Sequence, residues 1–190
     1  MTDASTYPEP PASGNEIDTL LGSLERQRAT FAWKCADLDE TGLRTRIDTS
    51  MLTLGGLLKH LAYMEDINFT RDFAGQALPA PWAAAGGRPG DWIWRTAADD
   101  SPDQLQTWWR EAVERSRLVV RQALADRGPD TPSASPDGRS YVLRRLLVDF
   151  IEEYARHTGH ADLLREAVDG RVGEDPPGRP YAYSVKLADR

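Results

Sequence analysis

The segment EEYARHTGHADLLRE, residues 152–166, brings Glu153 together with two of the chain's three histidines, His157 and His160. Glu153 and His157 are four residues apart, and this spacing places both side chains on one face of an α-helix. Carboxylate and imidazole groups are common ligands of divalent transition-metal ions. The segment therefore indicates metal chemistry, provided that another part of the chain supplies a further ligand.

The third histidine, His60, lies in the segment GGLLKHLAYME. It follows Leu57 by three residues and precedes Met64 by four, so it shares their apolar helix face. The segment around Glu153 has a similar stripe at helical spacing, which consists of Leu143, Leu146, Phe150, Glu153, His157, His160 and Leu164. Both patterns direct ionisable groups towards a core, where a lone carboxylate costs several kcal/mol unless it is paired or bound to a cation.

Two interpretations explain these inward-facing groups. In the first, Glu153 forms a buried hydrogen-bonded pair with a histidine or an arginine, and the other histidines are ordinary core residues. In the second, His60, Glu153 and His157 bind one divalent metal ion and leave coordination positions open for water and substrate. We favour the metal site, because every histidine of the chain lies on an inward face of one of two helices.

Four long segments with apolar residues at three- and four-residue steps must position these side chains. They cover residues 15–38, 53–75, 101–128 and 143–170, with Thr53 and Ser101 as expected N-caps. Long amphipathic helices joined by loops predict an all-α fold, specifically an antiparallel four-helix bundle. In such a bundle, functional sites form from inward-facing side chains of neighbouring helices.

The bundle is expected to occupy residues 15–170 as one domain, between a flexible N-terminal arm (1–14) and an irregular C-terminal tail (171–190). The segment QALPAPWAAAGGRPGDWIW, residues 76–94, contains three prolines and three tryptophans. It is too irregular for a predicted helix, and we interpret it as a long loop that could form part of a binding surface. Each tryptophan by itself is interpreted as packing.

Charge and cysteine content limit the expected partners and location. The chain has 30 acidic and 23 basic side chains, so it lacks the basic excess that nucleic acid or anionic lipid requires. Its single cysteine, Cys35, falls on the buried side of the first segment and is expected to be inert. The polar, proline-containing start does not resemble a signal peptide, and we predict a cytoplasmic protein without nucleic-acid or membrane partners.

The two histidine-bearing segments together resemble the DinB-like, or YfiT-like, superfamily of metalloenzymes, in particular its actinobacterial branch. The resemblance covers roughly residues 15–170. Members have a four-helix bundle with a metal held by a histidine of the second helix and an H-x-x-x-H pair on the last. Here His60 and His157 match that pattern, Glu153 replaces the first histidine of the pair, and HTGH places His160 where many members have glutamine.

The glutamate substitution is similar to the His, Glu, His arrangement of mycothiol-dependent isomerases in the same superfamily. The resemblance implies a divalent ion, with zinc favoured over nickel, iron or manganese, and a small thiol such as mycothiol as cosubstrate. The expected reaction is either transfer of that thiol to a small electrophile or thiol-assisted isomerisation of the electrophile. His160 is the candidate catalytic base, with a spare ligand or a partner of the metal ligands as alternative roles.

Two other functions are compatible with the sequence. A non-catalytic stress or regulatory bundle would use the metal only to join two helices, and a metal-independent bundle would bind an apolar ligand. We also predict a homodimer, because relatives often dimerise through helix faces and because Trp108 and Trp109 supply much apolar surface.

Overall fold

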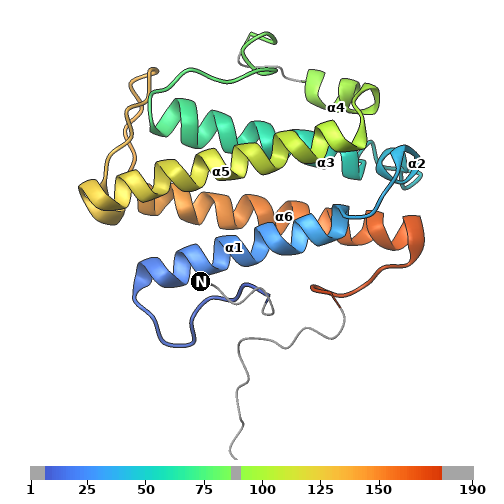
Figure 1. Cartoon of the computed structure of the whole chain (residues 1–190), viewed down its shortest axis with the longest axis horizontal. Helices are drawn as coiled ribbons and strands as arrows, with labels where there is room; N and C mark the ends of the chain where they lie inside the picture. Colours follow the sequence, from blue (N-terminus) through green and yellow to red (C-terminus); the bar gives the residue numbers. More distant parts are fainter. Residues whose placement is uncertain (1–6, 87–90, 177–190) are drawn as a thin grey trace, which may run out of the picture.

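The computed structural model describes residues 7–86 and 91–176, and this part of the chain is all-α (Figure 1). Its long helices are α1 (Glu16–Cys35), α3 (Leu54–Glu65), α5 (Pro102–Asp126) and α6 (Leu143–Asp169). The shorter elements are α2 (Glu40–Arg44), the π-helix η1 (Asp66–Phe73), α4 (Trp92–Thr96) and the 3-10 turns η2 (Ala97–Asp99) and η3 (Gly128–Asp130). Extended pairing in the described residues is limited to an isolated bridge between Pro132 and Val142.

Three helix ends follow the capping signals in the sequence. Thr53 Oγ1 accepts a hydrogen bond from the Gly56 amide at 2.9 Å, and Ser101 Oγ accepts one from the Gln104 amide at 3.3 Å. These bonds satisfy amides that have no partner inside the first helical turn. Gly170 ends α6 in the left-handed region, with φ of 78°. The predicted starts of α3 and α5 and the predicted end of α6 are therefore confirmed.

Two predicted helices differ from the observed ones. α1 ends at Cys35 rather than near Leu38, because Ala36 is extended and Asp37 has a positive φ of 59°. The second segment remains helical from Leu54 to Phe73 but changes from α to π geometry at Asp66. π-Helical turns often occur next to functional sites. Apolar periodicity indicates a helix but does not show where its hydrogen-bond pattern changes.

The tryptophan-bearing segment is wrongly predicted to lack a helix, because Trp92–Thr96 forms α4. The buried side chain of Lys59, on α3, holds this short helix in place. Its Nζ donates hydrogen bonds to Thr96 Oγ1 at 2.7 Å and to Asp100 Oδ2 at 2.5 Å, and it lies 4.2 Å from the centroid of the Trp92 ring. These tertiary contacts stabilise a single helical turn that has little intrinsic stability.

The long helices lie side by side (Figure 1), with α1 along α6 and α3 along α5, while α3 also contacts α6. The α3–α6 contacts show that these two helices run in opposite directions. His60 meets Glu153 near the start of α3, whereas Phe69, further along in η1, meets Phe150 with ring centroids 4.6 Å apart. A later position on the α3–η1 segment thus faces an earlier position on α6.

A buried carboxylate, Glu65 at the end of α3, connects the long helices. It is fully buried and accepts hydrogen bonds from Arg28 of α1 at 2.8 and 2.7 Å and from the Tyr154 hydroxyl of α6 at 2.8 Å. Trp109 of α5 donates to the same tyrosine oxygen at 2.9 Å. Burial is the largest cause of the raised pKa of Tyr154, so its hydroxyl stays protonated and donates to Glu65.

The single cysteine lies in the core, as predicted. Cys35 is 1% exposed, and burial raises the pKa of its thiol well above the usual range. A thiol that stays protonated is neither a strong nucleophile nor a metal ligand.

The described parts of the two predicted arms contact α1 at the same side chain, Arg26. Its guanidinium lies 4.7 Å from the centroid of the buried Tyr7 ring and 3.2 Å from Glu9 Oε1. Glu174 and Asp175 approach the same group at 3.3 and 3.5 Å. The domain limits stay predictions, and residues 1–6 and 177–190 lie outside the described residues.

The fold bears on two of the predicted partners. Trp109 is only 7% exposed, and Trp108 packs against Trp82 with ring centroids 5.8 Å apart. Both side chains therefore pack within the chain, and the predicted homodimer rests on the resemblance alone. Among the described residues, no helix combines the length and hydropathy that crossing a membrane requires.

The Glu65 network gives a prediction about stability. Replacing Glu65 with alanine leaves Arg28 buried beside only Glu25, and breaking a buried ion pair costs about 3–5 kcal/mol. We expect that loss in the free energy of unfolding measured by urea titration. The control is Arg44→Ala, which removes an exposed ion pair with Glu40 and should cost less than about 1 kcal/mol. Equal losses in the two variants would show that the network contributes no special stability.

Candidate metal centre

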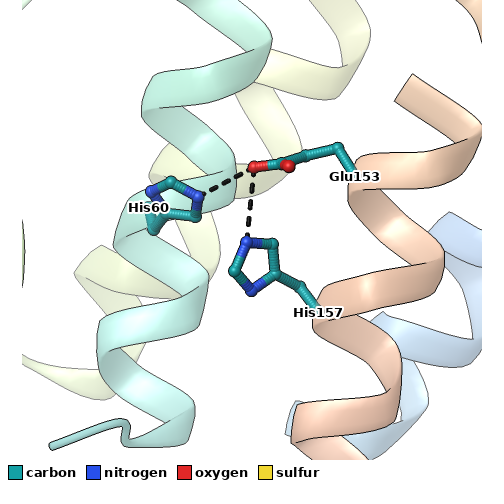
Figure 2. A group of neighbouring side chains, drawn as sticks. All are labelled: His60, Glu153 and His157. Carbon is teal, nitrogen blue, oxygen red and sulfur yellow. Dashed lines mark hydrogen bonds and ion pairs between the residues drawn. The ribbon is translucent and has the colours of Figure 1, made fainter. Parts of the chain in front are cut away.

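His60, Glu153 and His157 meet at the contact between α3 and α6 (Figure 2). One Glu153 oxygen, Oε1, lies 3.0 Å from His60 Nε2 and 3.3 Å from His157 Nε2. One ligand atom from each residue can be chosen so that all lie within 4.8 Å of one another. The structure therefore brings the three predicted metal ligands together.

The cluster lies at the edge of the core. The exposed fractions of the His60, Glu153 and His157 side chains are 16%, 23% and 11%. Burial is thus incomplete, and part of each side chain reaches the protein surface. The fully buried Glu65 network lies on the core side of the same helix pair.

Glu153 is held in its ionised form. Hydrogen bonds from His157 and His60 lower the pKa of its carboxyl well below the usual range and outweigh the opposing effect of burial. The carboxylate is therefore charged at neutral pH, as a metal ligand must be. The same contacts also satisfy Glu153 as a hydrogen-bonded pair, so both interpretations of the sequence agree with this geometry.

His160 lies beside the cluster and is not one of its three members. The Nδ1 atom of His160 lies 3.3 Å from Nδ1 of His157. The other nitrogen of His157, Nε2, is the one that faces Glu153. Burial, followed by the nearby His157, lowers the pKa of His160. A neutral His160 can accept a hydrogen bond from His157, and a bond of this kind fixes which histidine nitrogen is available to a metal.

Trp94, which the sequence analysis interprets as packing, covers one side of the cluster. Its ring stacks on the His60 ring, with centroids 4.8 Å apart and an interplanar angle of 26°. A Cβ atom at Gly56 would lie 3.2 Å from the Trp94 ring, so glycine permits this close approach. The sequence signal was the pair Gly55-Gly56 one turn before His60, although it does not identify which aromatic ring approaches.

The two tyrosines nearest the metal ligands in sequence do not face the cluster. Tyr154 points into the core, where it donates to Glu65, and Tyr63 is 8% exposed and packs against Trp82. Glu65 is a buried ionisable group that was not predicted from the sequence. Its signal was the spacing, because Glu65 follows Leu61 by four residues on the apolar face of α3.

The donor set fits a divalent transition-metal ion. Two imidazole nitrogens and one ionised carboxylate oxygen suit zinc, and the carboxylate also suits iron or manganese. Three protein ligands are typical of catalytic metal sites, because they leave a position for water or substrate. Bound at this site, a metal ion would replace the contacts that Glu153 now makes with the two rings.

The structure thus shows an all-α protein in which ionisable side chains of two facing helices meet at the edge of the core. A sequence model described as Mycothiol-S-transferase matches residues 19–170. This chain belongs to that family, and the resemblance seen in the sequence is confirmed. Among curated proteins, no match to the chain was found. The family supports a transferase that uses mycothiol.

The cluster predicts a pattern of metal content among single variants. We expect untagged wild-type protein to contain about one divalent ion per chain, and His60→Ala, Glu153→Ala and His157→Ala each to lose most of it. Glu152→Ala is the matched control, because it removes an exposed carboxylate of α6, paired with Arg156, that lies outside the group of three. Elemental analysis of the folded proteins measures the result. Equal metal in all five proteins would show that these residues are not the ligands.

Proposed function

We propose that this protein is a metal-dependent transferase that activates the thiol of mycothiol for reaction with a small electrophile. The carrying observation is the convergence of His60, Glu153 and His157 at a partly exposed edge of the core, in a chain of the Mycothiol-S-transferase family. The proposed fold is the antiparallel four-helix bundle of DinB-like proteins.

His60, Glu153 and His157 are the proposed metal ligands. A bound divalent ion would supply the positive charge that keeps a thiol ionised at neutral pH. In the overall reaction, the thiol loses its proton and a sulfur lone pair forms a bond to the electrophilic carbon. The leaving group then departs with its bonding electrons.

The chain's other residues have supporting roles in this proposal. Glu153 supplies a negative charge between the two imidazoles. We assign His160 as a positioning residue, because its contact with His157 Nδ1 leaves the His157 Nε2 directed at the cluster. Trp94 holds the His60 ring by stacking and shields it from water. Solvent water at the partly exposed cluster can accept the proton that the thiol loses.

The proposal predicts thiol consumption that depends on metal and on the cluster. Metal-loaded protein, mycothiol and a panel of electrophiles should give thiol loss well above the uncatalysed rate, and His157→Ala should return it to background. Adding mycothiol to cobalt-substituted protein should produce a sulfur-to-cobalt absorption band. Glutathione and bacillithiol serve as comparison thiols.

In the rival function, the protein is a non-catalytic bundle and the metal only joins α3 to α6. It is supported by the same contacts, because Glu153 already bridges the two helices through His60 and His157. In that case the metal would stabilise the fold, yet added thiol or azide would leave the cobalt spectrum unchanged. Thiol loss at the background rate for every electrophile, together with an unchanged spectrum, would favour this rival over the transferase.

A further inference from the structure

The cluster is covered at one end and adjoins a groove at the other. Trp94 stacks on His60 next to Gly56, towards the start of α3, and His160 adjoins His157 on the same side because α6 runs in the opposite direction. Towards the end of α3, the groove begins at Tyr63 and Met64, about one helical turn beyond His60. A ligand that reaches the cluster from this side therefore extends along the groove.

The groove consists of two adjoining cavities between the α3–η1 face and the first turns of α6. The larger has a volume of about 510 Å³ and the smaller about 230 Å³. They share Asn68 and Arg139 as lining residues, so they form one continuous depression. Asp149, which lines the smaller cavity, precedes Glu153 by one helical turn. The α6 side of the groove therefore starts next to Glu153, as its α3 side starts next to His60.

Hydrogen bonds connect the polar side chains of the groove. Asp72, which is buried, accepts hydrogen bonds from Arg71 at 2.6 Å and from Arg139 at 2.8 Å, and the more exposed Asp149 accepts one from Arg145 at 2.6 Å. The Asn68 amide donates to the Met64 carbonyl oxygen at 2.9 Å, which orients its side chain. The groove therefore presents paired donors and acceptors, with Asp72 and Asn68 as the most firmly held of them.

The charges along the groove balance. Each arginine that lines it has an aspartate within ion-pair distance, the pairs being Arg71–Asp72, Arg139–Asp72, Arg139–Asp137 and Arg145–Asp149. A ligand carrying carboxylates would lose hydration without gaining an uncompensated cation. Hydroxyl groups, which both donate and accept, instead match alternating guanidinium, amide and carboxylate groups. The groove therefore favours a neutral ligand rich in hydroxyls.

The size of the groove fits a ligand with two linked sugar-like rings. Tyr63 and Arg71 lie at its two ends on the α3–η1 segment, and eight helical residues span about 10–12 Å. Mycothiol has this form: its thiol is on a short cysteine arm attached to a neutral glycoside of glucosamine and inositol. Glutathione and bacillithiol carry carboxylates instead.

From these observations, we infer that the groove lined by Asn68, Arg139 and Asp149 binds the neutral glycoside half of the thiol cosubstrate. This inference rests on the proposed function for the position of the thiol, at the cluster of His60 and Glu153. The side chains that distinguish this thiol from other small thiols would then be different from the proposed metal ligands.

The test compares mycothiol with N-acetylcysteine, which has the thiol but no glycoside. With one electrophile and metal-loaded protein, Asn68→Ala and Arg139→Ala should each raise KM for mycothiol about 5- to 30-fold, the loss expected for one or two hydrogen bonds. Turnover of N-acetylcysteine should change less than about twofold. Arg110→Ala, an exposed arginine of α5 outside the groove, is the matched control and should change neither.

A binding measurement separates this inference from the proposed function. Calorimetric titration with the thiol-free neutral glycoside, N-acetylglucosaminyl-inositol, should show binding to wild-type protein and its loss in Arg139→Ala. Turnover of mycothiol with the same KM in wild type and both groove variants, without glycoside binding, would overturn the inference and leave the transferase standing. Glycoside binding without consumption of either thiol would keep the groove assignment and reject the transferase. Neither binding nor consumption would reject both.

Discussion

The packing of the long helices depends on compensating a fully buried negative charge, the carboxylate of Glu65. A buried carboxylate without partners costs several kcal/mol, and here its partners come from different long helices. Arg28 reaches it from α1 and Tyr154 from α6, while Trp109 of α5 orients the tyrosine. Because Tyr154 directly follows Glu153 in the chain, the network that fixes the core also fixes the register in which Glu153 faces His60.

The facing helices thus carry two carboxylates with different chemical behaviour. Glu65 is fully buried and paired with an arginine, whose positive charge is permanent, so its contacts are structural. Glu153 is partly exposed and is paired with two imidazole rings, whose nitrogens can bind a metal ion. Only the second arrangement offers a set of ligand atoms to a divalent ion. The two arrangements involve neighbouring residues of α6, because Glu153 belongs to the cluster and the next residue, Tyr154, belongs to the buried network.

Much of this arrangement was predictable from local sequence, because it depends on helical spacing. The i, i+4 pair of Glu153 and His157, the N-cap at Thr53 and the glycine end of α6 are all local signals. Stacking of Trp94 on His60 joins positions 34 residues apart through α4, whose stability comes from tertiary contacts of Lys59, so no local pattern reveals it. The change to π geometry at Asp66 likewise leaves no mark on apolar periodicity.

The burial of Cys35 has a consequence for chemistry at the groove. It is the chain's single cysteine, it is 1% exposed, and burial keeps its thiol protonated. An electrophile near the cluster therefore encounters no ionised sulfur that belongs to the protein. Reactive compounds that alkylate exposed cysteines would react with the small thiol cosubstrate, which the cell can replace, and would leave the polypeptide unmodified. A transferase of the proposed kind would resist inactivation by its own substrates, and its capacity would be set by the cellular supply of the thiol.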